Sequence, residues 1–197
     1  MKFTQPANSR AAKADATRAA ILASARKAFA EHGYDGAGLR GIAEAAGVTA
    51  MMVGRYFGSK EGLFGEVVTD TMRDPIILSQ DNLKRAELSR AFAEALVGVT
   101  TQGKVPLDGF LILFRSTGSA TAARIARERI ASVHHATATA AISGDHASER
   151  AALFLAIVAG VQMMRQMLEL EPLTEAKPAL LVELLTPVIS SLIEPGK

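Results

Sequence analysis

The chain has 197 residues, of which 49% are hydrophobic and 21% are charged. This composition excludes a mainly disordered protein, and the length allows one or two domains with a substantial core. Because cysteine is absent, disulfide scaffolds, thiolate metal sites and cysteine nucleophiles are excluded, as expected for a reducing cytosol. The polar N-terminus lacks the apolar core of a signal peptide, and the apolar stretch at residues 151–161 is shorter than the roughly 20 residues that span a bilayer. We therefore expect a cytoplasmic protein without a membrane segment.

The net charge of +2 is unevenly distributed along the chain. Residues 1–64 carry nine basic and five acidic residues, whereas the remainder carries 13 basic and 15 acidic residues. A basic N-terminal third on a weakly acidic body indicates a polyanionic partner that binds at one end of the protein.

Apolar residues recur at helical spacing throughout, which predicts an all-α fold of about nine helices. In the first part we expect helices at residues 14–31, 39–46, 49–57 and 60–72. Gly33 is placed to end the first of them, and Ser59 to cap the fourth. Further along, the pattern predicts helices at residues 82–100, 107–115, 120–142, 148–170 and 179–193.

The segment at residues 38–57 has the spacing of a helix-turn-helix motif. Ala43 is small enough for two helices to cross, Gly47 can adopt the positive φ that the turn needs, and Val53 can anchor the second helix. Thr49 is a suitable N-cap for that second helix. In such motifs the second helix enters the major groove of DNA. The spacing alone also occurs in helical proteins that do not bind DNA.

A longer stretch of sequence indicates DNA binding more specifically than the spacing of these residues does. The run TRAAILASARKAFAEHGYDGAGLRGIAEAAGVTAMMVGRYFGSKEGLF, from Thr17 to Phe64, resembles the TetR family of bacterial transcriptional regulators. The resemblance covers about residues 14–70. It implies a helix-turn-helix DNA-binding domain at 14–74 (motif 38–57), preceded by a flexible basic arm at 1–13 and followed by an effector-binding and dimerisation domain at 75–197.

The resemblance also implies a homodimer, most simply a repressor, each of whose third helices enters a major groove of a palindromic double-stranded operator. A small-molecule effector bound to the C-terminal domain would separate these helices through a shift of the fourth helix. Whether the basic arm follows the phosphates or enters a minor groove stays open.

By resemblance, Lys60 binds a phosphate at the start of helix four, and Tyr56 either binds phosphate or packs on Phe57. Arg40 is a candidate for a phosphate or a guanine edge. The full set of expected DNA-binding residues is Arg40, Thr49, Ala50, Met51, Met52, Arg55, Tyr56 and Lys60.

Four positions depart from the family pattern. Ala37 and Gly38 replace the common hydroxyl pair before helix two, and Met51 and Gly54 stand where glycine and an aromatic or asparagine are usual. The exposed face of helix three should therefore be apolar, with Met51 or Met52 against a thymine methyl and Arg55 on a guanine. Gly54 should weaken this helix by about 1 kcal/mol relative to alanine.

The C-terminal part is less informative, because its apolar stripes also suit an ordinary core. The candidate effector-binding residues are Phe92, Phe110, Phe114, His134, Phe154, Gln162, Met163 and Met167, whose scarcity of charge favours a neutral or lipophilic effector. The helix at 148–170 is apolar on more than one face, which favours dimerisation through Ala156, Gly160 and Met164.

Two other classes stay open. An all-helical enzyme has no support from the known catalytic, nucleotide or metal motifs, and the four histidines lack metal-binding spacing, so we expect no catalytic residue, metal or cofactor. A dimeric scaffold or small-molecule-binding protein with a degenerate DNA-binding domain is compatible with Ala37, Gly38 and Gly54.

Overall fold

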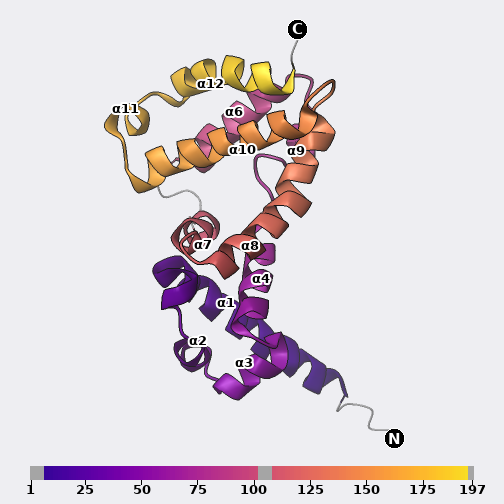
Figure 1. The fold of residues 1–197 in the computed structure, drawn as a ribbon, viewed down its shortest axis with the longest axis vertical. Helices are drawn as coiled ribbons and strands as arrows, with labels where there is room; N and C mark the ends of the chain where they lie inside the picture. The colour runs from indigo at the N-terminus through magenta and orange to yellow at the C-terminus, as the bar shows by residue number, and fades with distance from the viewer. Residues whose placement is uncertain (1–6, 102–107, 195–197) are drawn as a thin grey trace, which may run out of the picture. The chain divides into compact units, whose positions relative to one another are not determined.

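The computed structural model describes residues 7–101 and 108–194, and within these ranges every regular element is a helix (Figure 1). The expectation of an all-α fold is confirmed. The chain packs into two compact units. The first unit contains the described residues up to Thr71 together with Asp108–Arg127, and the second unit contains the other described residues.

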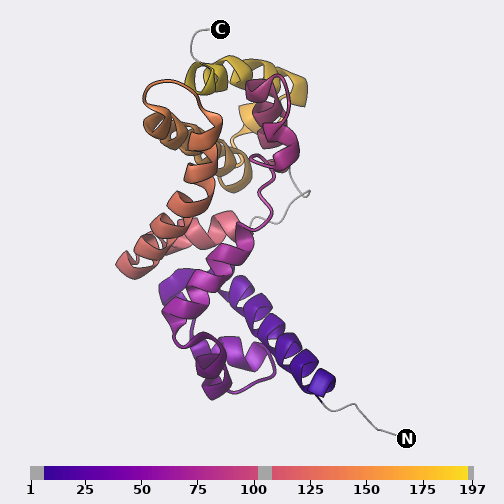
Figure 2. The ribbon, with the colours of Figure 1, turned by 90° about the vertical axis from the view of Figure 1, so that its right-hand side faces the viewer.

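The first unit is built around a long helix and a cluster of aromatic side chains. Its helices are α1 (Ala7–Gly36), α2 (Leu39–Ala45), α3 (Ala50–Phe57), α4 (Lys60–Thr71), α7 (Asp108–Ser116) and the greater part of α8 (Ala120–Ile130). In both ribbon views α2 and α3 lie beside one another (Figures 1 and 2). Phe64 lies edge-on to Phe29 and Tyr34, with ring centroids 5.1 and 5.0 Å away. Such pairs add to the burial of these large side chains, so α1 and α4 form one core.

The second unit holds the remaining helices around a core of its own. They are α5 (Gln80–Leu83), α6 (Leu88–Val99), the end of α8, the π-helical segment η1 (Ala131–His135), α9 (Ala136–Ala141), α10 (Ala147–Gln162), the π-helical segment η2 (Met163–Met167), α11 (Glu171–Thr174) and α12 (Pro178–Ile193). Phe92 of α6 and Phe154 of α10 are fully buried, with ring centroids 5.2 Å apart. Ile189 of α12 completes this contact, so α6, α10 and α12 pack together.

Within the part of the chain that the structure describes, each of the nine expected helices has a counterpart, and two short ones, α5 and α11, were not foreseen. The largest difference concerns the N-terminus. Helix α1 begins at Ala7, so residues 7–13 are helical, where the sequence predicted a helix only from residue 14, while residues 1–6 lie outside the described residues. The reason is composition, because Ala7, Ala11 and Ala12 favour a helix even where no core-facing stripe exists.

The segment Ala147–Met167, which joins α10 and η2, is long and apolar enough by length and composition to cross a membrane. The sequence-based expectation considered only residues 151–161 and missed this, because the helix continues beyond them without a break. Within this segment Arg165 is 5% exposed, and its guanidinium donates hydrogen bonds to the carbonyl oxygens of Val97 and Leu173. Those contacts join η2 to the end of α6 and to α11 inside the second unit.

Candidate nucleic-acid interface

The turn between α2 and α3 has the geometry that its residue types predict. Gly47 adopts φ 67°, which costs little without a side chain. Ala43 is buried, and its carbonyl oxygen accepts a hydrogen bond of 2.9 Å from the N–H of Val48. The small side chain at 43 and the glycine at 47 therefore let the two helices meet at a close, fixed angle.

Helix α3 is capped at its start and buried along one face. Thr49 has an extended backbone, and its Oγ1 accepts a hydrogen bond of 3.4 Å from the N–H of Met52, so the expected N-cap is confirmed. Val53 and Phe57, one helical turn apart, are buried against the unit. Because these two side chains pack in the core of the unit, the opposite face of α3 faces the solvent.

The outward face of α3 carries one long apolar and one cationic side chain. Met51 is 84% exposed and Arg55, one turn further on, is also exposed, as is Ala50. Among the described residues Arg55 has no ion pair or hydrogen bond. Met52 is half-buried, so of the two methionines Met51 presents the more accessible side chain.

The start of α2 lacks a side-chain cap. Gly38 occupies the N-cap position with an extended backbone, and no side chain accepts a hydrogen bond from the first turn. This agrees with the loss of the hydroxyl pair that the sequence indicates at Ala37 and Gly38. Arg40 is exposed in the same turn, so the cation nearest this helix start is accessible to solvent.

Lys60 stands at the start of α4 and contacts the end of α1. Its Nζ lies 3.4 Å from the carbonyl oxygen of Asp35 and 4.7 Å from the ring centroid of Tyr34. Burial, together with the nearby carboxylates of Glu61 and Asp35, raises the pKa of the Tyr34 hydroxyl. The ring therefore stays neutral and offers its face to the ammonium. Ser59 caps the same helix, since its Oγ accepts a hydrogen bond of 3.1 Å from the N–H of Gly62.

Tyr56 is half-buried, and its ring centroid lies 6.4 Å from that of Phe57. The structure thus brings Thr49, Ala50, Met51, Met52, Arg55 and Tyr56 together on α3 and its cap, with Lys60 on the following helix and Arg40 on the preceding one.

A set of contacts between α7 and the end of α1 was missed by the sequence-based reasoning. The guanidinium of Arg115 donates hydrogen bonds to the carbonyl oxygens of Ala30 and Glu31, and Ser116 Oγ accepts one of 3.0 Å from the N–H of Tyr34. Gly33 lies between these contacts with φ 66° and ψ −176°, and a Cβ there would lie 2.5 Å from the Arg115 carbonyl oxygen. These residues are more than 80 positions apart, and no local pattern could have paired them.

The candidate effector-binding residues are divided between the two units. Phe110 and Phe114 stack on α7 of the first unit with centroids 6.1 Å apart, whereas Phe92 and Phe154 are core residues of the second. His134 is in η1, where burial lowers its pKa. Gln162, Met163 and Met167 are half-buried near the end of α10 and in η2.

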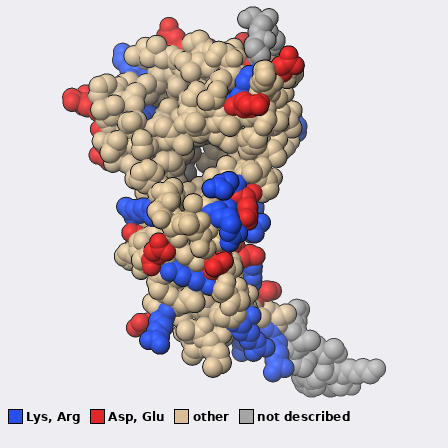
Figure 3. All heavy atoms as spheres, viewed as in Figure 1, with Lys and Arg blue, Asp and Glu red and all other residues tan. Residues whose placement is uncertain are grey.

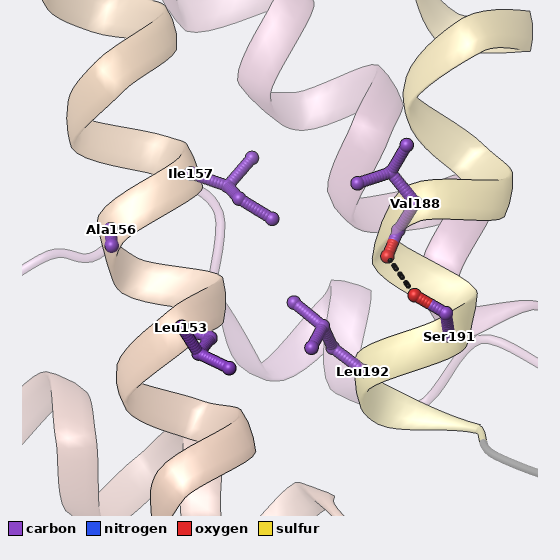
Figure 4. Close-up of a pocket in the computed structure, with 6 residues that line it drawn as sticks. All are labelled: Leu153, Ala156, Ile157, Val188, Ser191 and Leu192. Atoms are coloured by element: carbon purple, nitrogen blue, oxygen red, sulfur yellow. Dashed lines mark hydrogen bonds between the residues drawn. The ribbon is translucent and has the colours of Figure 1, made fainter.

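The second unit has an exposed apolar face on α10 and α12. Leu153 and Leu184 are 56% and 59% exposed, and Leu180 and Val188 lie one turn on either side of Leu184. A groove of about 400 Å³ between the two helices is lined by Leu153, Ala156, Ile157, Val188, Ser191 and Leu192 (Figure 4). Figure 3 shows the visible face of this region as mostly uncharged, whereas lysine and arginine are frequent over the first unit.

Comparison with known proteins matches two successive parts of the chain. A model of the tetR family of bacterial regulatory proteins matches residues 21–67, and a model of the Tetracyclin repressor-like C-terminal domain matches residues 86–193. Among curated proteins, the HTH-type transcriptional repressor AcnR of Corynebacterium glutamicum is 38% identical over 79 residues, which are 40% of this chain and 41% of AcnR. The regulatory protein RaaS of Mycobacterium tuberculosis is 58% identical over 45 residues, 23% of this chain and 21% of RaaS.

The chain thus spans less than half the length of these curated relatives. A solved structure extends the likeness to the whole fold. The TetR-family regulator SCO0857 of Streptomyces coelicolor superposes with a TM-score of 0.68 at 23% identity, covering 98% of this chain and 99% of that one. Since one family model alone spans residues 86–193, more than half of the sequence, the chain belongs to the TetR family of bacterial transcriptional regulators.

Proposed function

We propose that the protein is a cytoplasmic, homodimeric transcriptional regulator, most simply a repressor, that binds a palindromic DNA operator through α3. The observation that carries this proposal is the outward face of α3, where an exposed Met51 and an unpaired Arg55 stand on a helix fixed from behind by Val53 and Phe57. A helix of about 10–12 Å diameter fits the major groove, which is about 12 Å wide.

The side chains on this face suggest which bases they contact. Arg55 can donate two parallel hydrogen bonds to O6 and N7 of a guanine, whereas Met51 can pack on the methyl group of a thymine. We therefore expect an operator half-site with a guanine opposite Arg55 and a thymine step opposite Met51. Met52 contributes less, because it is half-buried.

Phosphate contacts position the helix on either side of these bases. Lys60 uses one ammonium hydrogen on the Asp35 carbonyl, which leaves two donors for a phosphate near the start of α4. Thr49 at the start of α3 and Tyr56 near its end offer hydroxyl groups for further phosphates, and Arg40 supplies another cation at the start of α2. Such contacts fix orientation and add affinity without selecting sequence.

We propose that two copies pair through α10 and α12. The exposed apolar residues Leu153, Leu184 and Val188 together form the kind of patch that marks a protein interface. Ala156 and Gly160 add two small residues at four-residue spacing, which allow helices to approach closely, and Met164 follows one turn later. Pairing of this face also accounts for the apolar length of Ala147–Met167 without a membrane.

The effector is proposed to be a small neutral or lipophilic molecule that binds in the C-terminal domain and releases the operator. Support comes from the low charge of the candidate residues and from His134, whose pKa is lowered by burial, so that the imidazole is neutral at pH 7. Of these candidates, the half-buried Gln162, Met163 and Met167 offer the more accessible side chains, since Phe92 and Phe154 already pack on each other.

The experiment is selection of bound fragments from random duplex DNA at two salt concentrations, with Arg55→Ala in parallel. We expect a palindromic motif for the wild type, and loss of its guanine preference in the variant. Lys84→Ala is the control, because it removes the same charge from an exposed position in the second unit. Weak binding without a motif, equal in all three proteins, would contradict the proposal and favour a dimeric scaffold.

A further inference from the structure

The first turns of α1 extend past the part of that helix that packs in the core. The core-facing stripe of α1 contains Ile21 and Phe29, both fully buried. Counting back at about 100° per residue, Arg10 lies within about 20° of Ile21 around the helix, and Lys13 lies about 80° away. The face of α1 that is apolar inside the unit therefore becomes basic where it leaves the core. Both cations are exposed.

Arg18 of α1 contacts both the end of α3 and α4. Its guanidinium lies 5.1 Å from the ring centroid of Phe57 at the end of α3, and its Nη2 lies 2.8 Å from Glu66 Oε2. At about 1.5 Å per residue, Lys13 and Arg10 are about 7 and 12 Å further along α1 from this contact. Figures 1 and 2 both place these first turns at the end of the unit where α3 lies.

Among the described residues, neither Arg10 nor Lys13 forms an ion pair, and the first turn of α1 contains no acidic residue. Because residues three apart on a helix are neighbours, the helical backbone holds Arg10 and Lys13 next to each other on one side of α1. We propose that this helical extension of α1 binds the phosphate backbone of the duplex through Arg10 and Lys13, beside the groove that α3 occupies. The inference rests on the proposed function, because α3 must first be seated on DNA.

The helical form also decides which part of the duplex is contacted. A helix with its side chains is about 10–12 Å across, whereas the minor groove of B-DNA is about 6 Å wide. The described extension therefore lies against phosphates and contributes affinity independent of base sequence.

The test is the salt dependence of binding by the full chain to two duplexes of equal length, one carrying the selected operator and one of random sequence. Removing one lysine or arginine from a phosphate reduces the slope of log K against log salt by about 0.9, so the slope for a dimer of Arg10→Ala or Lys13→Ala should be smaller by about 1.8. The reduction should be equal on both duplexes. Lys27→Ala is the matched control, since it removes an exposed charge from the same helix, where Lys27 already lies 4.0 Å from Glu31.

A fourth variant, Ala12→Pro, keeps both charges but disrupts the helical turn that precedes residue 12, which contains Arg10. It should bind like Arg10→Ala. Slopes of Arg10→Ala and Lys13→Ala equal to wild type on both duplexes would overturn the inference, and so would an unchanged slope for Ala12→Pro. The two claims fail separately. If the wild type bound both duplexes equally well, the proposed function would be contradicted, whereas a reduced slope of the variants on both duplexes would still support the phosphate contacts.

Discussion

Two exposed helical faces of this protein differ in chemistry. On α3 of the first unit, Arg55 and Met51 project from an exposed face. Arg40 at the start of α2 and Lys60 at the start of α4 add positive charge on the neighbouring helices. On α10 and α12 of the second unit, Leu153 and Leu184 belong to an exposed face with almost no hydrogen-bonding groups. A charged, hydrated partner suits the first face, and an apolar copy of itself suits the second. Salt should therefore weaken binding at the first face and leave the second nearly unaffected.

The largest expected effect is a loss of stability caused by a substitution in the core of the second unit. Phe154→Ala removes a fully buried ring that packs on Phe92, and should lower the free energy of unfolding by about 3–5 kcal/mol. Chemical denaturation measures the decrease, and hydrogen exchange should locate the increased opening in the second unit. A first loss of protection in α2 and α3 would contradict the division into two cores.

Gly33→Ala is the corresponding change in the first unit. The backbone conformation at Gly33 costs about 1–3 kcal/mol for other residues, and the Cβ would overlap the Arg115 carbonyl oxygen, so we expect a decrease of about 2–5 kcal/mol in the free energy of unfolding. Hydrogen exchange should locate the opening where α7 meets α1. Gly41→Ala in α2 is the control, because nothing lies within 4 Å of its Cβ position. Equal stability of the two variants would show that the contacts of Arg115 do not constrain Gly33.

Leu184→Glu tests whether the apolar face of α10 and α12 joins two copies of the chain. A carboxylate buried there in both copies should weaken dimerisation at least a hundredfold, or about 3 kcal/mol, while the fold of each chain is retained because Leu184 is exposed. Sedimentation at several protein concentrations measures the association. Glu183→Gln, at the neighbouring exposed position, should leave it unchanged. Wild-type association that falls steeply with salt would contradict an apolar interface.

The smallest expected effect is on α3 itself. Gly54→Ala should raise the free energy of unfolding by up to about 1 kcal/mol, because alanine favours the helix and nothing lies within 4 Å of the added Cβ. Thermal unfolding measures the change, with Gly98→Ala in α6 as the control for an equally open helical glycine. A decrease in stability for Gly54→Ala alone would mean that α3 is strained in a way its packing does not indicate.

The parts of the structure that follow from short-range chemistry could be predicted from the sequence. Gly47 in the turn, Thr49 as N-cap and Ser59 as cap of α4 each act within a few residues, so residue type and spacing sufficed. These features give the fold and the candidate DNA-binding face.

The rest depends on contacts between distant segments. Arg115 and Ala30 are 85 positions apart, and nothing near either residue indicates their hydrogen bond. Phe110 belongs by packing to the first unit, although its sequence position suggested the C-terminal domain. The start of α1 was missed for another reason, since alanine propensity alone, without an amphipathic stripe, extends the helix to Ala7.

The most direct measurement is the stoichiometry of the full chain on a short duplex that carries the selected operator, determined by sedimentation equilibrium for wild type and Leu184→Glu. We expect two wild-type chains per duplex, and a marked loss of affinity in the variant because its two α3 helices are no longer joined. One wild-type chain per duplex, or an unchanged affinity and stoichiometry in Leu184→Glu, would contradict the claim that the apolar face holds two α3 helices on one operator.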